Sequence, residues 1–153
     1  MKSGSPTQIT EVKLDIDRPR SRRSRANLLR LVNSREWKEV LQFAHPRFGR
    51  LRVISVRVAK TWHGWHVVVC VANKIPPEDL TFLQLSLGSN VAREMLNRRR
   101  IITCNQKNWN LLYPYKISAA GDIVSEERPD VRLSRKVAAL IKEFQRRKEV
   151  RKK

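Results

Sequence analysis

Cysteine, glycine and acidic residues are all scarce in this chain of 153 residues. Its two cysteines have neither CxxC nor Cys/His spacing, which argues against a disulfide framework and a structural zinc site. No apolar run approaches the length of about 18 residues that a membrane span needs, and the N-terminus lacks the apolar stretch of a signal peptide. We therefore expect an intracellular protein of the cytoplasm or nucleoid, neither secreted nor held in a membrane.

The shortage of acidic residues leaves the chain strongly basic. Lys and Arg number 33 against 14 Asp and Glu, and the net charge is +19. A polyanion is the first partner to consider, because neutralising phosphates releases their condensed counterions. We expect this partner to be nucleic acid, DNA or RNA, as a single strand or a primer-template. The cations predicted to contact it form two runs: Arg18, Arg20, Arg22, Arg23 and Arg25 in the first, and Arg98, Arg99 and Arg100 in the second.

Alternating hydrophobic residues predict several strands, and β-branched residues are common among them. The segment 65–72 is apolar on both faces, which is typical of a central strand. A shift of the alternation near Val53–Ile54 indicates a bulge. The predicted strands are 11–17, 50–60, 65–72, 101–104, 111–118 and 123–125.

Helical spacing predicts the remaining elements of an ordered domain over 11–125. One or two helices are expected over 22–44, with Ser21 or Ser24 as the N-cap and a break at 33–34. A second helical stripe starts at the two prolines 76–77 and has a kink or a joint at 88–90. Residues 1–10 are expected to be a flexible lead-in. Residues 126–153 are expected to be a charged linker and a basic helix capped by Ser134.

The order strand, helix, strand, strand, helix, strand is the βαββαβ plan of an RRM-like or ferredoxin-like α+β fold. In this plan the first and third strands lie side by side in the middle of an antiparallel sheet. The helices cover one face of the sheet and leave the other face open. We therefore expect an open face on which side chains of the first and third strands meet.

Asp15 and Asp17 stand two apart on the first predicted strand, so they share one face, about 6.5 to 7 Å apart at Cα. Strand parity places His66 of the third strand on that same face. Paired carboxylates on an open, cationic surface suit Mg²⁺-dependent phosphoryl transfer. The blander alternative is that both aspartates form ion pairs with nearby arginines such as Arg18 or Arg20.

These residues resemble a known family. The acidic pair in Leu14-Asp15-Ile16-Asp17 and the histidine in Gly64-Trp65-His66-Val67 resemble the signatures of the archaeo-eukaryotic primase (primase-polymerase) superfamily. The resemblance covers residues 12 to about 124 and implies an RRM-like sheet that carries a nucleotidyl-transfer site. It implies that Asp15 and Asp17 bind Mg²⁺ or Mn²⁺ and that His66 contacts the phosphates of a nucleoside triphosphate.

The resemblance also implies a third acidic ligand from a late strand, and Asp122 is preferred over Glu126 and Glu127. Trp62 and Trp65 are candidates for base stacking on the sheet. We therefore expect a nucleic-acid-binding replication or repair protein that resembles a compact primase-polymerase module. The alternative is a non-catalytic, basic nucleic-acid-binding protein, such as a replication accessory or ribonucleoprotein component, which needs the arginines but neither aspartate.

Overall fold

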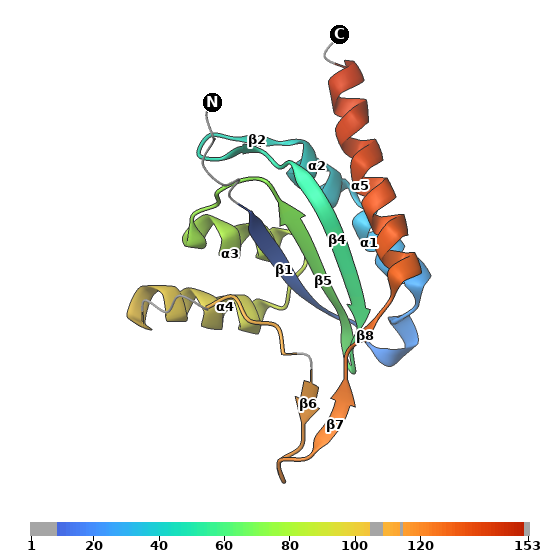
Figure 1. Cartoon of the computed structure of the whole chain (residues 1–153), viewed down its shortest axis with the longest axis vertical. Coiled ribbons are helices and arrows are strands. Elements are labelled where there is room, and N and C mark those ends of the chain that lie inside the picture. Colours follow the sequence, from blue (N-terminus) through green and yellow to red (C-terminus); the bar gives the residue numbers. More distant parts are fainter. Residues whose placement is uncertain (1–8, 105–108, 114, 152–153) are drawn as a thin grey trace, which may run out of the picture.

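The computed structural model describes residues 9–104, 109–113 and 115–151, and this part of the chain has an α+β fold (Figure 1). Its strands are β1 (Thr10–Asp17), β2 (Ala44–His45), β3 (Gly49–Arg50), β4 (Val53–Lys60), β5 (Gly64–Val71), β6 (Tyr115–Ile117), β7 (Ile123–Glu126) and β8 (Arg128–Pro129). Its α-helices are α1 (Arg25–Val32), α2 (Arg35–Gln42), α3 (Pro77–Ser86), α4 (Val91–Arg99) and α5 (Val131–Arg151). A 3₁₀ turn η1 (Arg20–Arg22) and a π-helical segment η2 (Arg100–Cys104) complete the elements.

Four strands form the main sheet, which is antiparallel throughout in the order β1-β5-β4-β8 (Figure 1). The interior place of β5 agrees with its apolar residues on both faces. The register of β4 against β5 shifts between Val53 and Ser55, where the bulge was predicted. The β6–β7 hairpin is a separate two-stranded sheet that projects away from the main one (Figure 1).

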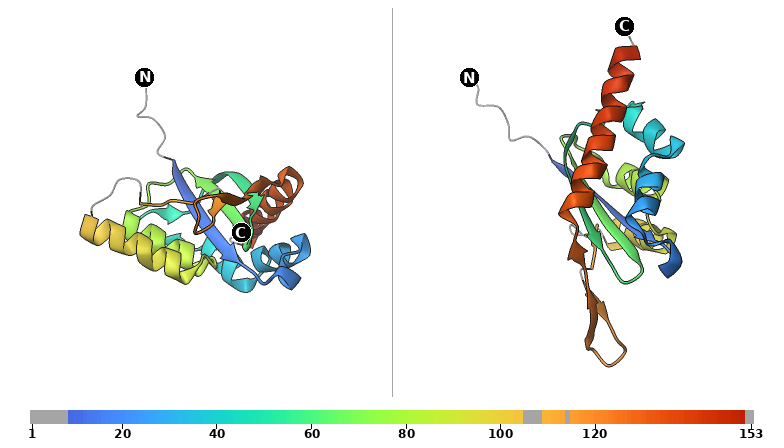
Figure 2. Two further views of the ribbon diagram at one scale, coloured as in Figure 1. Left: turned by 90° about the horizontal axis from the view of Figure 1, so that it is seen from below. Right: turned by 90° about the vertical axis from the view of Figure 1, so that its right-hand side faces the viewer.

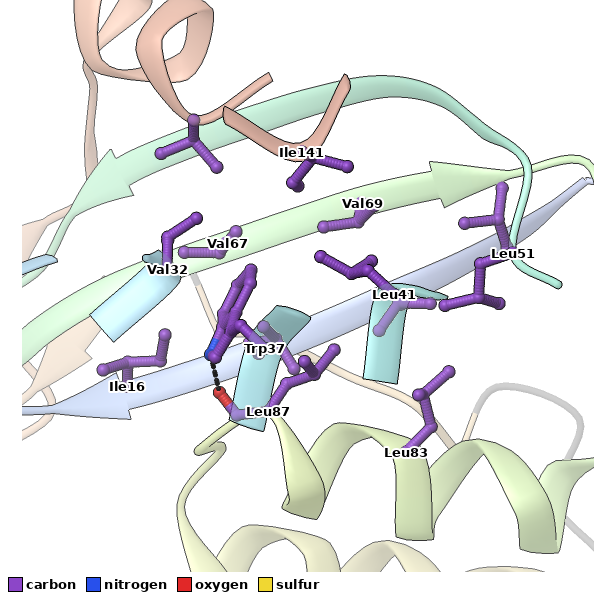
Figure 3. Packing of buried hydrophobic residues seen from close by; sticks show 14 of the residues in the cluster. Ile16, Val32, Trp37, Leu41, Leu51, Val67, Val69, Leu83, Leu87 and Ile141 are labelled. Carbon is purple, nitrogen blue, oxygen red and sulfur yellow. Dashed lines mark hydrogen bonds between the residues drawn. The ribbon is translucent and has the colours of Figure 1, made fainter. Parts of the chain in front are cut away.

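The hydrophobic core lies between one face of the sheet and the helices. The right-hand view of Figure 2 shows α1, α2 and α3 on the same side of the sheet. Figure 3 shows Trp37 of α2 among core side chains, and its indole Nε1 donates to the carbonyl of Leu87 at 2.9 Å. The last helix contributes Leu133, Val137, Ile141 and Phe144 to the same cluster. α5 therefore packs into the same core as the sheet.

One edge of the sheet differs from the expected plan. β1 was predicted in the middle, but in the described part of the chain no strand pairs with its outer edge. Polar groups of the segment from α3 to α4 form hydrogen bonds with the backbone of this edge instead. Lys13 N donates to Gln84 Oε1 at 2.9 Å, and Asp15 N donates to Ser89 Oγ at 3.0 Å.

The carbonyls of this edge are bonded as well. Arg93 Nη1 donates to the carbonyl of Lys13 at 3.0 Å, and Asn90 N donates to that of Asp15 at 2.7 Å. Backbone groups left without partners would cost free energy, so these bonds replace those that a further strand would supply. We call the residues Gln84, Ser89, Asn90, Arg93 and Glu94 the edge network.

Residues 101–104 were predicted as a strand, and this prediction is wrong because they form η2, directly after α4. Between Arg99 and Cys104 the sequence contains no glycine or proline to end the helix. The hydroxyl of Thr103 donates to the carbonyl of Arg99 at 2.6 Å, which favours the continued helical path.

The cap of α5 was also placed wrongly. Asp130, not Ser134, holds the helix start, because its Oδ1 accepts from Leu133 N at 3.0 Å. The hydroxyl of Ser134 instead accepts from Val58 N at 2.8 Å and so joins α5 to β4. Ser24 does cap α1, since its side chain accepts from Asn27 N. None of the helices in the described ranges is long and apolar enough to cross a membrane.

Candidate active site

A cavity of about 220 Å³ lies where β1 ends and β5 begins, and Asp15, Asp17 and His66 all line it. Strand parity and register bring them together, because Asp15 pairs with His66 and Asp17 pairs with Gly64. The other lining residues come from the β4–β5 turn and from the segment around β6 and β7: Thr61, Trp62, His63, Tyr113, Lys116, Ser125, Glu126 and Glu127.

Gly64 permits the close approach of the two strands at the cavity. A Cβ at this position would lie 1.9 Å from the carbonyl oxygen of Ile16, which is far inside any real contact distance. A side chain there would force β1 away from β5 next to Asp17. The glycine in the sequence Gly64-Trp65-His66 therefore allows the short distance between the strands at the site.

His66 is buried between two carboxylates. Its Nδ1 lies 2.7 Å from Glu127 Oε2, and its Nε2 lies 3.7 Å from Asp15 Oδ1. An ionised carboxylate can only accept, so Glu127 favours the tautomer that carries a proton on Nδ1. The ring is thereby held with Nε2 directed towards Asp15.

The edge network holds both aspartates in place. Asp15 is bonded through its backbone N–H and carbonyl, and Asn90 Nδ2 donates to Asp17 Oδ2. Burial raises the pKa of Asp15, and the negative charge of Asp17 raises it further, while His66 and Arg93 oppose the rise. A positive charge bound between the two carboxylates would relieve their repulsion.

The charge of this cavity is opposite to that of the chain. Four of the 14 acidic residues line it, together with Lys116, His63 and His66. Lys116 Nζ lies 2.5 Å from His63 Nε2. Among the described residues, no three His, Cys, Asp or Glu side chains form a group able to hold a metal ion by themselves.

Two carboxylates nevertheless fit a Mg²⁺ ion that takes its other ligands from water and substrate phosphates, which is its usual coordination in phosphoryl-transfer sites. Asp122, the preferred third ligand, lies in the turn between β6 and β7, where its N–H bonds to Ser118 Oγ at 3.2 Å. It does not line the cavity, whereas Glu126 and Glu127, which the sequence left as alternatives, do.

Several predicted nucleic-acid contacts have partners inside the protein. Arg23 donates to the carbonyls of Thr61 and Trp62 and so pins the β4–β5 turn beside the cavity. Arg25 Nε lies 2.7 Å from Asp130 Oδ2, at the start of α5. Arg18 is half-buried, Arg22 is exposed, and the side chain of Arg20 lies outside the described part.

In the second run, too, some arginines contact other residues of the protein. Arg100 Nη1 donates to Asn97 Oδ1 at 3.2 Å, and the Arg98 guanidinium lies 5.1 Å from the ring centre of Phe82. Arg99 is exposed. Among the predicted contacts whose side chains are described, Arg22, Arg25, Arg98 and Arg99 are exposed, and of these Arg25 has an acidic partner.

The two tryptophans proposed for stacking have different environments. Trp62 is 37% exposed at the rim of the cavity, with Lys116 Nζ 5.8 Å from its ring centre. Trp65 is only 1% exposed, so the prediction that it stacks bases is wrong. Its parity on β5 matches Val67 and turns it into the core beneath the helices.

The sequence did not point to the edge network or to the contact between Glu127 and His66. Glu94 and Asn97 are buried polar residues of α4, and the prediction of this helix rested only on the spacing of its apolar residues. Because they are three residues apart, Glu94 and Asn97 lie on the same face of the helix. This spacing, with the polar residues Gln84 and Ser89 before it, is the sequence signal for a buried polar face. Glu127 is 61 residues from His66 along the chain, and no local pattern joins them.

Comparison of the chain with models of protein families, with curated proteins and with solved structures finds no match.

Proposed function

We propose that the protein binds nucleic acid in replication or repair and carries a metal-dependent nucleotidyl-transfer site like that of the primase-polymerase superfamily. The observation that carries the proposal is the meeting of Asp15, Asp17 and His66 in one acidic cavity of a chain with a net charge of +19. Paired carboxylates are ligands that suit a divalent cation, and such a cation would relieve the repulsion between Asp15 and Asp17.

The arrangement of the sheet supports an RRM-like assignment. β1, β5 and β4 are neighbours in the main sheet, and we propose that they correspond to the first, third and second strands of a βαββαβ plan. The departure is at the outer edge of β1, where the edge network takes the place of the fourth strand. We therefore assign a modified RRM-like sheet, with the site on the face away from the helices.

In the proposed site, Asp15 and Asp17 hold Mg²⁺ or Mn²⁺. When bound, the ion supplies Lewis-acid polarisation and neutralises charge on the transferred phosphoryl group. Asn90 orients Asp17 through its side-chain amide, and the hydrogen bonds of the Asp15 N–H and carbonyl hold the main chain at Asp15 in place. The raised pKa of Asp15 means that protons compete with the metal there as the pH falls.

His66 is proposed to contact phosphate through Nε2, because Glu127 engages Nδ1. Lys116 adds a cation to the lining of the cavity, and its Nζ contacts His63 Nε2. A neighbouring cavity of about 480 Å³ shares His66 and Glu127 with this one. Together the two cavities offer an acidic metal end and an adjoining space for a nucleotide. Lys13 and Arg57 are the cations of that space, where Glu11 pairs with them at 3.8 Å and 2.9 Å.

The experiment is nucleotide incorporation on a primer-template with Mg²⁺ or Mn²⁺, for the wild type, Asp15→Asn and Asp17→Asn. The exposed carboxylate of Glu78 provides a control variant, Glu78→Gln. The proposal predicts metal-dependent extension that both aspartate variants abolish and the control retains. Absence of extension by the wild type, with nucleic-acid binding unchanged in Asp15→Ala/Asp17→Ala, would favour the non-catalytic binding protein.

A further inference from the structure

A basic cleft of about 460 Å³ lies between the β3–β4 region and the C-terminal half of α5. Two arginines from the strand side, Arg50 and Arg52, and two cations from the helix, Lys142 and Arg146, line it. The other lining residues are Leu51, Val53 and Gln145, so none of the lining residues is acidic. The cleft belongs to neither run of arginines considered above.

The walls of the cleft are fixed to one another. Gln145 Nε2 donates to the carbonyl of Leu51 at 2.6 Å, which ties α5 to the strand side, and to the carbonyl of Leu41 in α2 at 3.1 Å. Arg50 donates back to the carbonyl of Gln145, and Arg52 donates to the carbonyl of Ala72 at the end of β5. Arg50 and Arg52 are therefore positioned by the fold before any ligand binds, which lowers the entropy cost of binding for these two side chains.

Elsewhere in the protein many arginines have acidic partners. The described ion pairs of arginine join Arg25 to Asp130, Arg35 to Glu39, Arg47 to Asp79, Arg57 to Glu11 and Arg93 to Glu94. In the part of the chain that the structure describes, Arg52, Lys142 and Arg146 form no such pair, and all three are exposed. Like charges around one cleft repel, and a bound anion would relieve that repulsion.

The position of the cleft separates it from the candidate active site. Val53 lines the cleft at the start of β4, and Thr61 lines the acidic cavity just after β4 ends. At about 3.3 Å per residue, these two points are roughly 25 Å apart. A nucleic-acid duplex, with one phosphate per strand about every 3.4 Å, spans this distance in about seven or eight base pairs.

We propose that this cleft binds the phosphate backbone of nucleic acid, as a second contact region at the opposite end of β4 from the acidic cavity. Guanidinium groups bind phosphate through two parallel hydrogen bonds, and an ammonium adds a point charge. The contact needs neither a metal ion nor Asp15 and Asp17. It therefore holds whether or not the protein catalyses nucleotidyl transfer.

The test is the salt dependence of binding to a labelled DNA duplex of about 20 base pairs, measured by fluorescence anisotropy on the full chain without metal or nucleotide. The cleft variant is Arg52→Gln/Lys142→Gln/Arg146→Gln. The control is Arg30→Gln/Arg135→Gln/Lys136→Gln, which removes the same charge from exposed positions that do not line the cleft. Circular dichroism and thermal unfolding of both variants confirm that each is folded.

Each phosphate contact on duplex DNA contributes about 0.9 to the slope of log affinity against log salt concentration. We expect the cleft variant to reduce the slope by about 2.7, and the control variant by less than about 1. Equal reductions in the two variants would overturn the proposal, since total charge alone would then explain both. A cleft variant that binds duplex normally but loses binding to anionic phospholipid vesicles would also overturn it, and would assign the cleft to lipid.

The same titration with Asp15→Asn/Asp17→Asn distinguishes this proposal from the catalytic one. The cleft proposal predicts an unchanged slope for that variant, whatever its effect on nucleotide incorporation.

Discussion

Replacing Glu94 with alanine tests whether the edge network holds β1 in place. The carboxylate is 3% exposed and accepts from Ser89 Oγ at 2.7 Å, Gln84 Nε2 at 2.8 Å and Asn97 Nδ2 at 3.3 Å. Arg93 Nη1 donates to it as well, and the Arg93 side chain is only 10% exposed. Removing Glu94 therefore leaves a buried guanidinium and three polar groups without this acceptor.

The size of the effect follows from the burial of the ion pair. Breaking a buried pair by removing one partner costs about 3 to 5 kcal/mol, because the remaining charge is not compensated. Burial already lowers the pKa of Arg93, and the negative charge of Glu94 opposes that change. We expect Glu94→Ala to lower the free energy of unfolding by about 4 kcal/mol. Such a loss is a large part of the free energy of unfolding of a typical domain, which is about 5 to 15 kcal/mol.

The assay is urea unfolding followed by tryptophan fluorescence, with Glu39→Ala as the matched control. Glu39 also pairs with an arginine at 2.8 Å on a helix, but its side chain is 63% exposed. An exposed pair of this kind contributes little, so the control should unfold almost as the wild type does. If Glu94→Ala changed stability no more than Glu39→Ala, the edge network would not be holding β1.

Three further substitutions test other parts of the structure. Trp37→Phe removes the donor to the buried carbonyl of Leu87, and urea unfolding should show a loss of about 2 kcal/mol; no measurable loss would contradict the role of that bond. Gly64→Ala places a Cβ 1.9 Å from a β1 carbonyl oxygen, and the expected loss is about 3 kcal/mol; wild-type stability would contradict the close approach of β1 and β5. The hydrogen bond from the N–H of Leu133 lowers the pKa of Asp130 from its usual value of 3.8, and Arg25 lowers it further. The ionised carboxylate therefore stabilises the fold above about pH 3.8, and this stabilisation is lost as the pH falls through the folded-state pKa. The difference in unfolding free energy between the wild type and Asp130→Ala should be about 1 kcal/mol near pH 7 and smaller near pH 3, and a difference that grew on acidification would contradict this assignment.

Much of the fold was predictable because strands and helices leave local periodic signals. The alternation of Val12, Leu14 and Ile16 predicted both the strand and its buried face. The sequence predicted one or two helices over 22–44 with a break at 33–34, and the structure has two, the second of which is capped by Ser34, whose side chain accepts from Trp37 N. The same parity argument placed Asp15 and His66 on one face, which the register of β1 and β5 reproduces.

The remaining features depend on contacts between distant segments, which no local pattern encodes. β1 was expected to have a strand on both sides, but side chains such as Gln84 and Ser89 bond to its backbone instead. The contact between Glu127 and His66 forms because the chain returns to the sheet at β8. Strand alternation places Trp65 on the same face as Val67, in the core. The stacking prediction relied on its aromatic side chain instead of on this alternation.

The most direct test of the central claim is Mn²⁺ binding to the wild type and to Asp15→Asn/Asp17→Asn, followed by electron paramagnetic resonance and by broadening of backbone amide signals. The account predicts one Mn²⁺ site that broadens the signals of Asp15, Asp17 and His66, binds more tightly with a nucleoside triphosphate present, and is lost in the double variant. Because the pKa of Asp15 is raised, we also expect the affinity for Mn²⁺ to fall as the pH is lowered. Equal Mn²⁺ binding by the double variant, or broadening at these three residues no greater than at the exposed Glu78, would contradict a metal-dependent site in this cavity.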